Sequence, residues 1–310
     1  MVVSPPMQKR HLWFAALFIS FSVSLYARTS GPRVLLVDAH PDDETAYAAT
    51  VYKIHHDLHG TIDLVVITDG QGGYKYSTLA EPYYHLKLTQ EKIGRKYLPE
   101  IRKEEMERAG RDIGLHHIYF LMQRDNRYTL NPYEVLDSNW NIPYVKSRLR
   151  QILIKGHYDF AFMLLPTPTT HGHHKAAAIL TLSVIDSLPP GVPHPIALGG
   201  DVIEKGKQPV HFTELAGFPI TRVSDGLPSY SFDRDQSFGF HHALNYKIIV
   251  DWDIAEHKSQ GTMQLAMDKG DLEEFYYFDV NPPGGRAKAK ALFDKLAINY
   301  YPELTYPGIK

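Results

Sequence analysis

The chain has 310 residues, of which 44% are hydrophobic, with 33 basic and 35 acidic side chains and no cysteine. This length suits one large globular domain or two small ones. The near-neutral charge gives no electrostatic reason to expect a nucleic-acid partner, and we expect none. Without cysteine there is no disulfide, no thiol nucleophile and no cysteine-liganded zinc, so any metal must be held by histidines and carboxylates.

The first 27 residues are typical of an export signal. Lys9 and Arg10 form a basic start, residues 12–26 are an uncharged, largely apolar run, and Ala27 offers a small residue for cleavage. The alternative is an uncleaved membrane anchor, although the run is shorter than the roughly 20 residues that a spanning helix needs. In either case we expect the rest of the chain to lie outside the cytoplasm, periplasmic or extracellular, with membrane association if the segment is retained.

The chain then alternates strand and helix signals. We expect, in order, a strand at 33–38, a helix at 43–58 that ends before Gly60, a strand at 62–68, a glycine turn at 69–73, a helix at 100–113, a strand at 117–122, a helix at 143–155, a strand at 159–165 and a helix at 175–187. The strands are short apolar runs of the kind that parallel sheets bury on both faces. Such alternation predicts an open, mostly parallel α/β sheet.

The pattern loosens towards the C-terminus. Proline and glycine are dense between residues 189 and 239, where we expect several short strands, and helices are expected at 254–267 and 286–298. A separate second domain is not required. We therefore expect residues 28–310 to form a single domain whose part 189–310 is more irregular.

The sequence His40-Pro41-Asp42-Asp43-Glu44 stands where the first strand gives way to the first helix. In open α/β sheets, ligands bind at the carboxyl ends of the strands. One interpretation is structural, since acidic residues at a helix start cap the helix and complement its dipole. The other is that the imidazole and the carboxylates bind a ligand.

A second polar segment favours the ligand interpretation. His171 and His174 follow the expected strand at 159–165, again on a loop that leads into a helix. Two strand ends that carry histidine and carboxylate can converge on one metal, with a position left open for water. Zinc suits such a set, and iron(II), cobalt or nickel accept the same types of ligand.

These motifs resemble those of the PIG-L/LmbE-like N-acetylglucosaminyl deacetylases. The resemblance rests on motifs that occur in the family's order: Ala39 to Glu44, the glycine turn with Thr68, Gly70 and Gly73, the helical pair Arg102 and Glu105, the pair His171 and His174 with Ala176, and His257 to Gln260. The family implies a Rossmann-like, mostly parallel sheet with flanking helices, and hydrolysis of carbon–nitrogen bonds in linear amides.

The resemblance also implies roles for individual residues. His40, Asp43 and His174 would bind one zinc ion, and Asp42 would be the general base that accepts a proton from the attacking water. His171, either protonated or as a hydrogen-bond donor, would stabilise the tetrahedral oxyanion.

Substrate contacts are implied for Arg102, Asp125, His257 and residue 71, where this chain has Gln71 in place of the usual glutamate. His173 stands where the family often has an aspartate that orients the first histidine of the pair. These two departures concern the substrate and the protonation of His171 rather than the metal ligands.

The leading hypothesis is a zinc-dependent deacetylase that acts on an N-acetylated amino sugar or glycoconjugate. One alternative keeps the metal and the water but cleaves another amide or an ester. The other is a metal-stabilised carbohydrate-binding protein without turnover. The presence of both Asp42 and His171 argues against the last, because simple binding requires neither a base nor an oxyanion donor.

Overall fold

The computed structural model describes residues 31–301. The expected export signal lies outside these residues, so export stays a prediction. Within residues 31–301, no helix is both long and apolar enough to cross a membrane.

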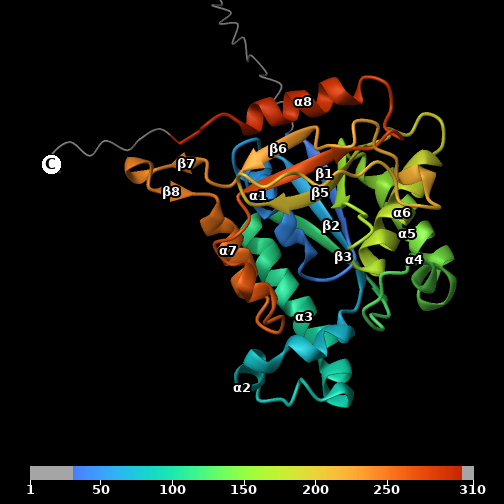
Figure 1. Cartoon of the computed structure of the whole chain (residues 1–310), viewed down its shortest axis with the longest axis vertical. Coiled ribbons are helices and arrows are strands. Elements are labelled where there is room, and N and C mark those ends of the chain that lie inside the picture. The colour runs from blue at the N-terminus through green and yellow to red at the C-terminus, as the bar shows by residue number, and fades with distance from the viewer. Residues whose placement is uncertain (1–30, 302–310) are drawn as a thin grey trace, which may run out of the picture.

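A seven-stranded sheet forms the centre of the molecule, with the strand order β3-β2-β1-β4-β5-β9-β6 (Figure 1). The first five strands in this order are parallel, and β9 and β6 extend the sheet in antiparallel fashion. The bounds are β1 Arg33–Asp38, β2 Thr61–Thr68, β3 Leu115–Gln123, β4 Phe160–Leu164, β5 Ile196–Ile203, β6 Tyr230–Asp233 and β9 Leu272–Tyr277. A separate pair joins β7 Ser237–Phe238 to β8 Leu244–Asn245. The predicted open, mostly parallel sheet is confirmed.

Helices cover both faces of the sheet because successive residues of its buried strands point to opposite sides. In β1, Leu35 and Val37 join a core with α5 Ile142–Gly156 and α6 Gly172–Asp186. Val34 and Leu36 join a core on the other face. The helices of that second face are α1 Ala48–His56, α3 Glu91–Ile113, α7 Lys247–Glu256 and α8 Gly285–Leu296. Two short helices, α2 Glu81–Tyr84 and α4 Pro132–Glu134, lie at the periphery (Figure 1).

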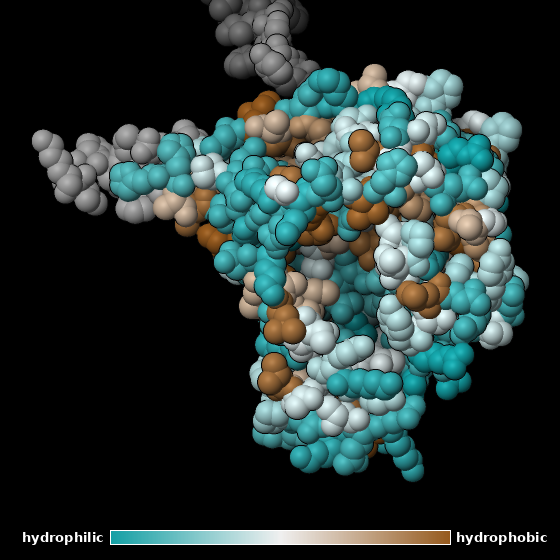
Figure 2. Space-filling view, in the orientation of Figure 1, coloured by the Kyte–Doolittle hydropathy of each residue, from teal (hydrophilic) through white to brown (hydrophobic). Residues whose placement is uncertain are grey.

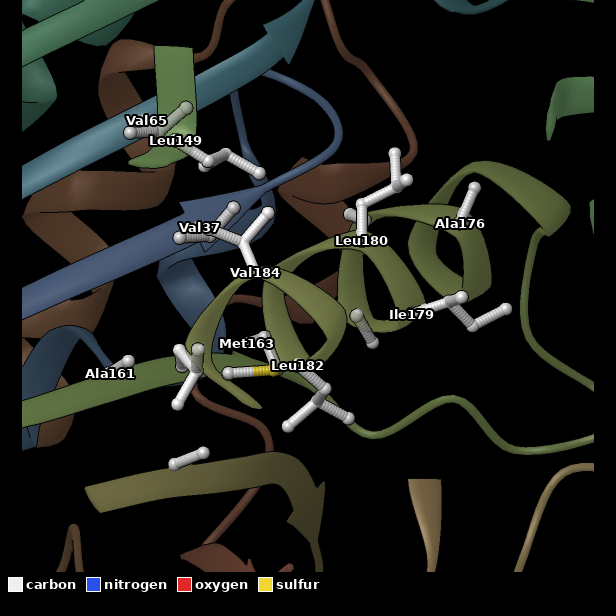
Figure 3. Packing of buried hydrophobic residues seen from close by; sticks show 14 of the residues in the cluster. Val37, Val65, Leu149, Ala161, Met163, Ala176, Ile179, Leu180, Leu182 and Val184 are labelled. Atoms are coloured by element: carbon white, nitrogen blue, oxygen red, sulfur yellow. The ribbon is translucent and has the colours of Figure 1, made fainter. Parts of the chain in front are cut away.

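Helix α6 is buried along most of its length. Its residues Leu180 and Val184 are at most 2% exposed and belong to the same core as Val37 and Met163. Figure 3 shows Val184 directed towards Val37 of β1. Each such side chain stabilises the fold by about 1.5–3 kcal/mol. The N-terminus of α6 is therefore held firmly beside the ends of β1 and β4.

The expected helix at 43–58 is two helices. A 3₁₀ helix, Asp43–Ala46, is followed by α1, and the backbone of Tyr47 between them is not helical. The Tyr47 hydroxyl donates to Oδ1 of buried Asp38 at 3.0 Å, and the Glu273 carboxylate accepts from the first amides of α1. These tertiary contacts fix the break. At the other end, the left-handed residue is His59 rather than Gly60.

Other boundaries differ where packing overrides a sequence signal. Helix α3 begins at Glu91 rather than residue 100 and contains Pro99, although proline and Gly94 usually indicate a helix boundary. Gly94 is needed because a Cβ there would lie 2.3 Å from the carbonyl oxygen of Leu88.

The prediction of a helix at 254–267 is wrong: α7 ends at Glu256, and a separate 3₁₀ helix occupies Met263–Ala266. The sequence analysis also did not predict strand β9, which pairs with both β5 and β6. The helix expected at 286–298 is confirmed as α8.

Candidate functional site

A pocket of about 690 Å³ lies at the carboxyl ends of β1 and β4. These strands are neighbours, and the strand order runs outwards from them in both directions, β2 and β3 on one side and β5 on the other. Such a switch point leaves a crevice where ligands bind in open α/β sheets. The pocket is lined by the loops after β1, β2, β3 and β4, by part of α3 and by residues 260–263. Figure 2 shows the surface hollowed, with mostly hydrophilic residues around the recess.

His40, Asp43 and His174 meet at the base of this pocket. Nδ1 of His40 lies 3.0 Å from Nε2 of His174, which in turn lies 3.1 Å from Oδ1 of Asp43. Each residue offers a ligand atom, and all three atoms lie within 4.8 Å of one another. Two imidazole nitrogens and a carboxylate oxygen form a donor set that suits Zn²⁺ or a similar divalent cation. The residues present therefore fit the metal that the sequence predicts.

The backbone turn after β1 fixes the Asp43 carboxylate. Its Oδ2 accepts hydrogen bonds from the amides of Ala39 at 3.0 Å and His40 at 2.9 Å. Burial by itself would raise the pKa of Asp43, but His174 and His40 hold it well below its usual range. Burial would likewise lower the pKa of His40, but the neighbouring Asp43 raises it to about 9. Asp43 is thus a carboxylate at neutral pH.

The ring nitrogens that face away from the cluster also have partners. Nδ1 of His174 lies 2.9 Å from the hydroxyl of Thr170, and Nε2 of His40 lies 3.0 Å from Nδ1 of His173. His173 is fully buried, and its other nitrogen lies 3.2 Å from the side-chain amide of Asn139. Such outer contacts fix the orientation and tautomer of metal-binding histidines.

Asp42 lies beside the cluster and lines the pocket. Its Oδ1 is 3.0 Å from Nη2 of Arg102, a side chain only 3% exposed. Arg102 also donates to the carbonyl oxygens of Gly70 and Pro41, at 2.9 Å and 3.3 Å. The Asp42 side chain is 14% exposed. Asp42 is therefore held on one side and open to the pocket on the other.

His171 caps α6. Its Nδ1 accepts the backbone amide of His173 at 2.9 Å, so the ring proton of the neutral imidazole is on Nε2. Burial, together with nearby His40, lowers the pKa of His171 to about 2. Of the two forms that the sequence left open, this arrangement favours the neutral hydrogen-bond donor. The ring lines the same pocket as Asp42.

The remaining expected substrate contacts divide into two groups. Arg102 and Asp125 line the pocket, and Asp125 accepts the amide of Gly72 at 3.0 Å. The side chain of Gln71 instead donates to Asp69 at 2.7 Å. Fully buried His257 lies with Nε2 2.5 Å from Glu44, and neither Gln71 nor His257 is among the described residues that line the pocket.

Sequence reasoning missed several residues at the site. Thr170 lies four positions before His174, and that spacing beside the histidine pair is the signal that would have identified it. Asn139 has no such signal, because only the folded π-helical segment 135–139 brings it to His173. Tyr128 packs edge-on against His171, with ring centroids 4.8 Å apart. Arg95 donates to the carbonyl oxygens of residues 125 and 126 and shapes the outer wall.

A comparison with protein-family models gives one match. Residues 35–185 match the model of the family PIG-L, GlcNAc-PI de-N-acetylase. The matched region contains His40, Asp42, Asp43, His171 and His174. No curated protein shows significant similarity to the chain.

Several solved structures resemble the chain at low identity. The 4-carboxy-2-hydroxymuconate hydratase GalB from Pseudomonas putida is 12% identical, with a TM-score of 0.49, covering 79% of this chain and 95% of that one. A conserved protein from Thermus thermophilus is 17% identical, with a TM-score of 0.49; the match covers 79% of this chain and 93% of that one. N,N'-diacetylchitobiose deacetylase from Pyrococcus horikoshii is 18% identical, with a TM-score of 0.42; the match covers 78% of this chain and 83% of that one. The functional argument therefore depends on the chain's own residues.

Proposed function

Because residues 35–185 of this chain belong to the GlcNAc-PI de-N-acetylase family, PIG-L, we propose that the protein is a zinc-dependent hydrolase that removes the acetyl group from an N-acetylated amino sugar or glycoconjugate. The observation that carries the proposal is that one pocket contains possible metal ligands, a possible base and a possible oxyanion donor. The pocket is lined by the metal-binding set, by the carboxylate of Asp42 and by the imidazole of His171. A binding protein would need neither of the last two.

Each residue has a separate task in this reaction. His40, Asp43 and His174 would hold the divalent cation, which would supply Lewis acidity towards water and a carbonyl oxygen. Asp42 accepts the proton of the water as its oxygen attacks the acetamide carbonyl carbon. The Nε2–H of His171 donates a hydrogen bond to the oxyanion that develops there. The carbon–nitrogen bond then breaks, Asp42 returns the proton to the leaving nitrogen, and the products are acetate and a free amine.

The pocket walls support a sugar as the substrate class. A volume of about 690 Å³ lies within the usual range for small-molecule sites. Tyr74, Tyr76 and Tyr128 line the pocket and can present aromatic faces to a sugar ring. Asp125, also in the wall, can accept hydrogen bonds from sugar hydroxyls.

The proposal is tested by metal analysis of the purified protein followed by a screen of N-acetylated amino sugars for free amine and acetate. We expect bound zinc, release of both products from at least one sugar, loss of activity after chelation and recovery when zinc is restored. Turnover only of unrelated amides or esters would contradict the substrate class. Sugar binding without turnover by the zinc-loaded protein would contradict the enzymatic assignment.

A further inference from the structure

A second group of possible ligands lies inside the protein, away from the pocket. Glu44, Asp253 and His257 each have 0% of their surface exposed. One ligand atom from each lies within 4.8 Å of the others. Glu44 belongs to the 3₁₀ helix Asp43–Ala46, Asp253 to α7, and His257 follows the end of α7. None of the three lines the pocket.

Most polar atoms of this buried cluster have no hydrogen-bond partner. The one bond within it joins Nε2 of His257 to Oε1 of Glu44. Oε2 of Glu44, both carboxylate oxygens of Asp253 and Nδ1 of His257 are buried without a partner among the described residues. An unsatisfied buried polar atom costs about 1–3 kcal/mol, and an unpaired buried charge costs more.

The nearby arginines do not pair with the carboxylates of the cluster. Burial raises the pKa of Glu44 and of Asp253 well above the usual range, and the charges of Arg102 on Glu44 and of Arg234 on Asp253 offset this only in part. Arg102 is paired with Asp42. Arg234 is paired with Glu273 at 2.9 Å. Neither donates a hydrogen bond to Glu44 or Asp253.

Protons alone satisfy this group poorly. A proton on Asp253 would neutralise its charge, but the new hydroxyl and the other oxygen would still lack partners. A proton on His257 would strengthen its bond to Glu44 and place a positive charge near Asp253, but both carboxylate oxygens of Asp253 would still lack a hydrogen bond. A cation shared by all three would neutralise two carboxylates and give each residue a partner.

We propose that Glu44, Asp253 and His257 form a second, structural site for a divalent transition-metal cation, separate from the pocket. Two carboxylates and one imidazole suit zinc, whereas Mg²⁺ and Ca²⁺ prefer sites built from oxygen alone. The cation would join α7 to the turn that carries Asp42 and Asp43. This site would therefore support the position of the residues that the pocket uses.

Zinc stoichiometry tests the proposal in the full chain. The protein is stripped with a chelator, reloaded with zinc, dialysed against metal-free buffer and analysed for metal per chain. We expect two zinc ions in the unaltered protein. We expect one in the variant Asp253→Asn/His257→Gln and one in Asp43→Asn/His174→Gln. The matched control Asp251→Asn, also on α7 but outside the cluster, should keep two.

If the unaltered protein binds only one zinc ion, and Asp43→Asn/His174→Gln binds none, the proposed second site is wrong and the proposed function is unaffected. Two zinc ions retained in Asp253→Asn/His257→Gln would also overturn it. If that variant does not fold, Asp43→Asn/His174→Gln decides alone: it should still hold one zinc, and zinc should raise its melting temperature, because a ligand that binds only the folded state stabilises it. Zinc that binds to neither variant would contradict the second site.

Discussion

Nη2 of Arg102 lies 3.0 Å from Oδ1 of Asp42, so a side chain from the middle of α3 holds the carboxylate that follows β1. The same guanidinium donates to the carbonyl oxygen of Gly70, in the loop after β2. One buried cation thus joins the two loops that form the inner wall of the pocket. The family resemblance assigns Arg102 to the substrate, and this contact adds a positioning role for Asp42.

Replacing Arg102 by glutamine should destabilise the protein strongly. The change leaves the Asp42 carboxylate and two carbonyl oxygens without their donor, and loss of one partner of a buried ion pair costs about 3–5 kcal/mol. Urea denaturation would measure the change in the free energy of unfolding. The control is Arg127→Gln, whose exposed pair with Glu134 should contribute less than about 1 kcal/mol. Equal losses in both variants would contradict the structural role of Arg102.

The variant Asp42→Asn should abolish most of the turnover and keep the metal. An amide cannot accept the proton of the attacking water, so we expect the rate of acetate release to fall by about 10²–10⁴-fold. Zinc content should be unchanged because Asp42 is not one of the three ligands. The exposed Asp186→Asn is a suitable control. Full activity in Asp42→Asn would show that another group is the base.

Thr170→Val should weaken zinc binding without removing a ligand. Its hydroxyl lies 2.9 Å from Nδ1 of His174, and loss of such an outer contact typically reduces metal affinity by about 10–100-fold. Competition with a chromophoric zinc chelator would measure the affinity. Thr169→Val is the matched control, since that hydroxyl contacts Thr167 rather than a histidine. A zinc affinity equal in the two variants would show that Thr170 does not orient the ring.

Glu274→Gln should stabilise the protein in a pH-dependent way. Glu274 of β9 faces Asp201 of β5 in the antiparallel register. Burial, and then the charge of Asp201, raises the pKa of Glu274 from 4.5 to about 7. The folded state holds this proton more tightly than the unfolded chain, so the stabilising contribution is present below pH 4.5 and is lost as the pH rises towards 7.

Glutamine stays neutral throughout, so its advantage over glutamate should grow between pH 4.5 and pH 7 and then level off. Melting temperatures of the two proteins across this range would show the divergence. A difference that does not vary with pH would mean that packing, rather than ionisation, separates the two proteins.

Most of the correct predictions from the sequence came from the composition of the strands and from one short motif. The apolar runs at β1, β2 and β4 identify buried parallel strands because both of their faces must be apolar. His40 lies in the loop after β1, and His174 lies at the start of the helix that follows β4. The carboxyl ends of parallel strands share one edge of a sheet. Local pattern was therefore enough to predict that these two polar segments lie at the same edge of the sheet.

The start of α3 and the strand β9 could not be predicted in this way. Gly94 and Pro99 oppose a helix locally. The close approach of the Leu88 carbonyl oxygen requires glycine at position 94, and this contact cannot be inferred from the local sequence. β9 depends on pairing with β5 and β6, which come from elsewhere in the chain. These features are decided by contacts that have no local signal.

The sequence by itself thus determined the parallel sheet and the two segments that carry the candidate site, because strand composition and side-chain chemistry are properties of adjacent residues. The choice of His40, Asp43 and His174 as candidate metal ligands came from the family resemblance. Only the tertiary structure decided how those ligands are held. The pairing of Asp42 with Arg102, the contact of His40 with His173 and the burial of Glu44 against His257 join distant segments. Their geometry follows from the packing of α3, α6 and α7 around the sheet, which no short stretch of sequence encodes.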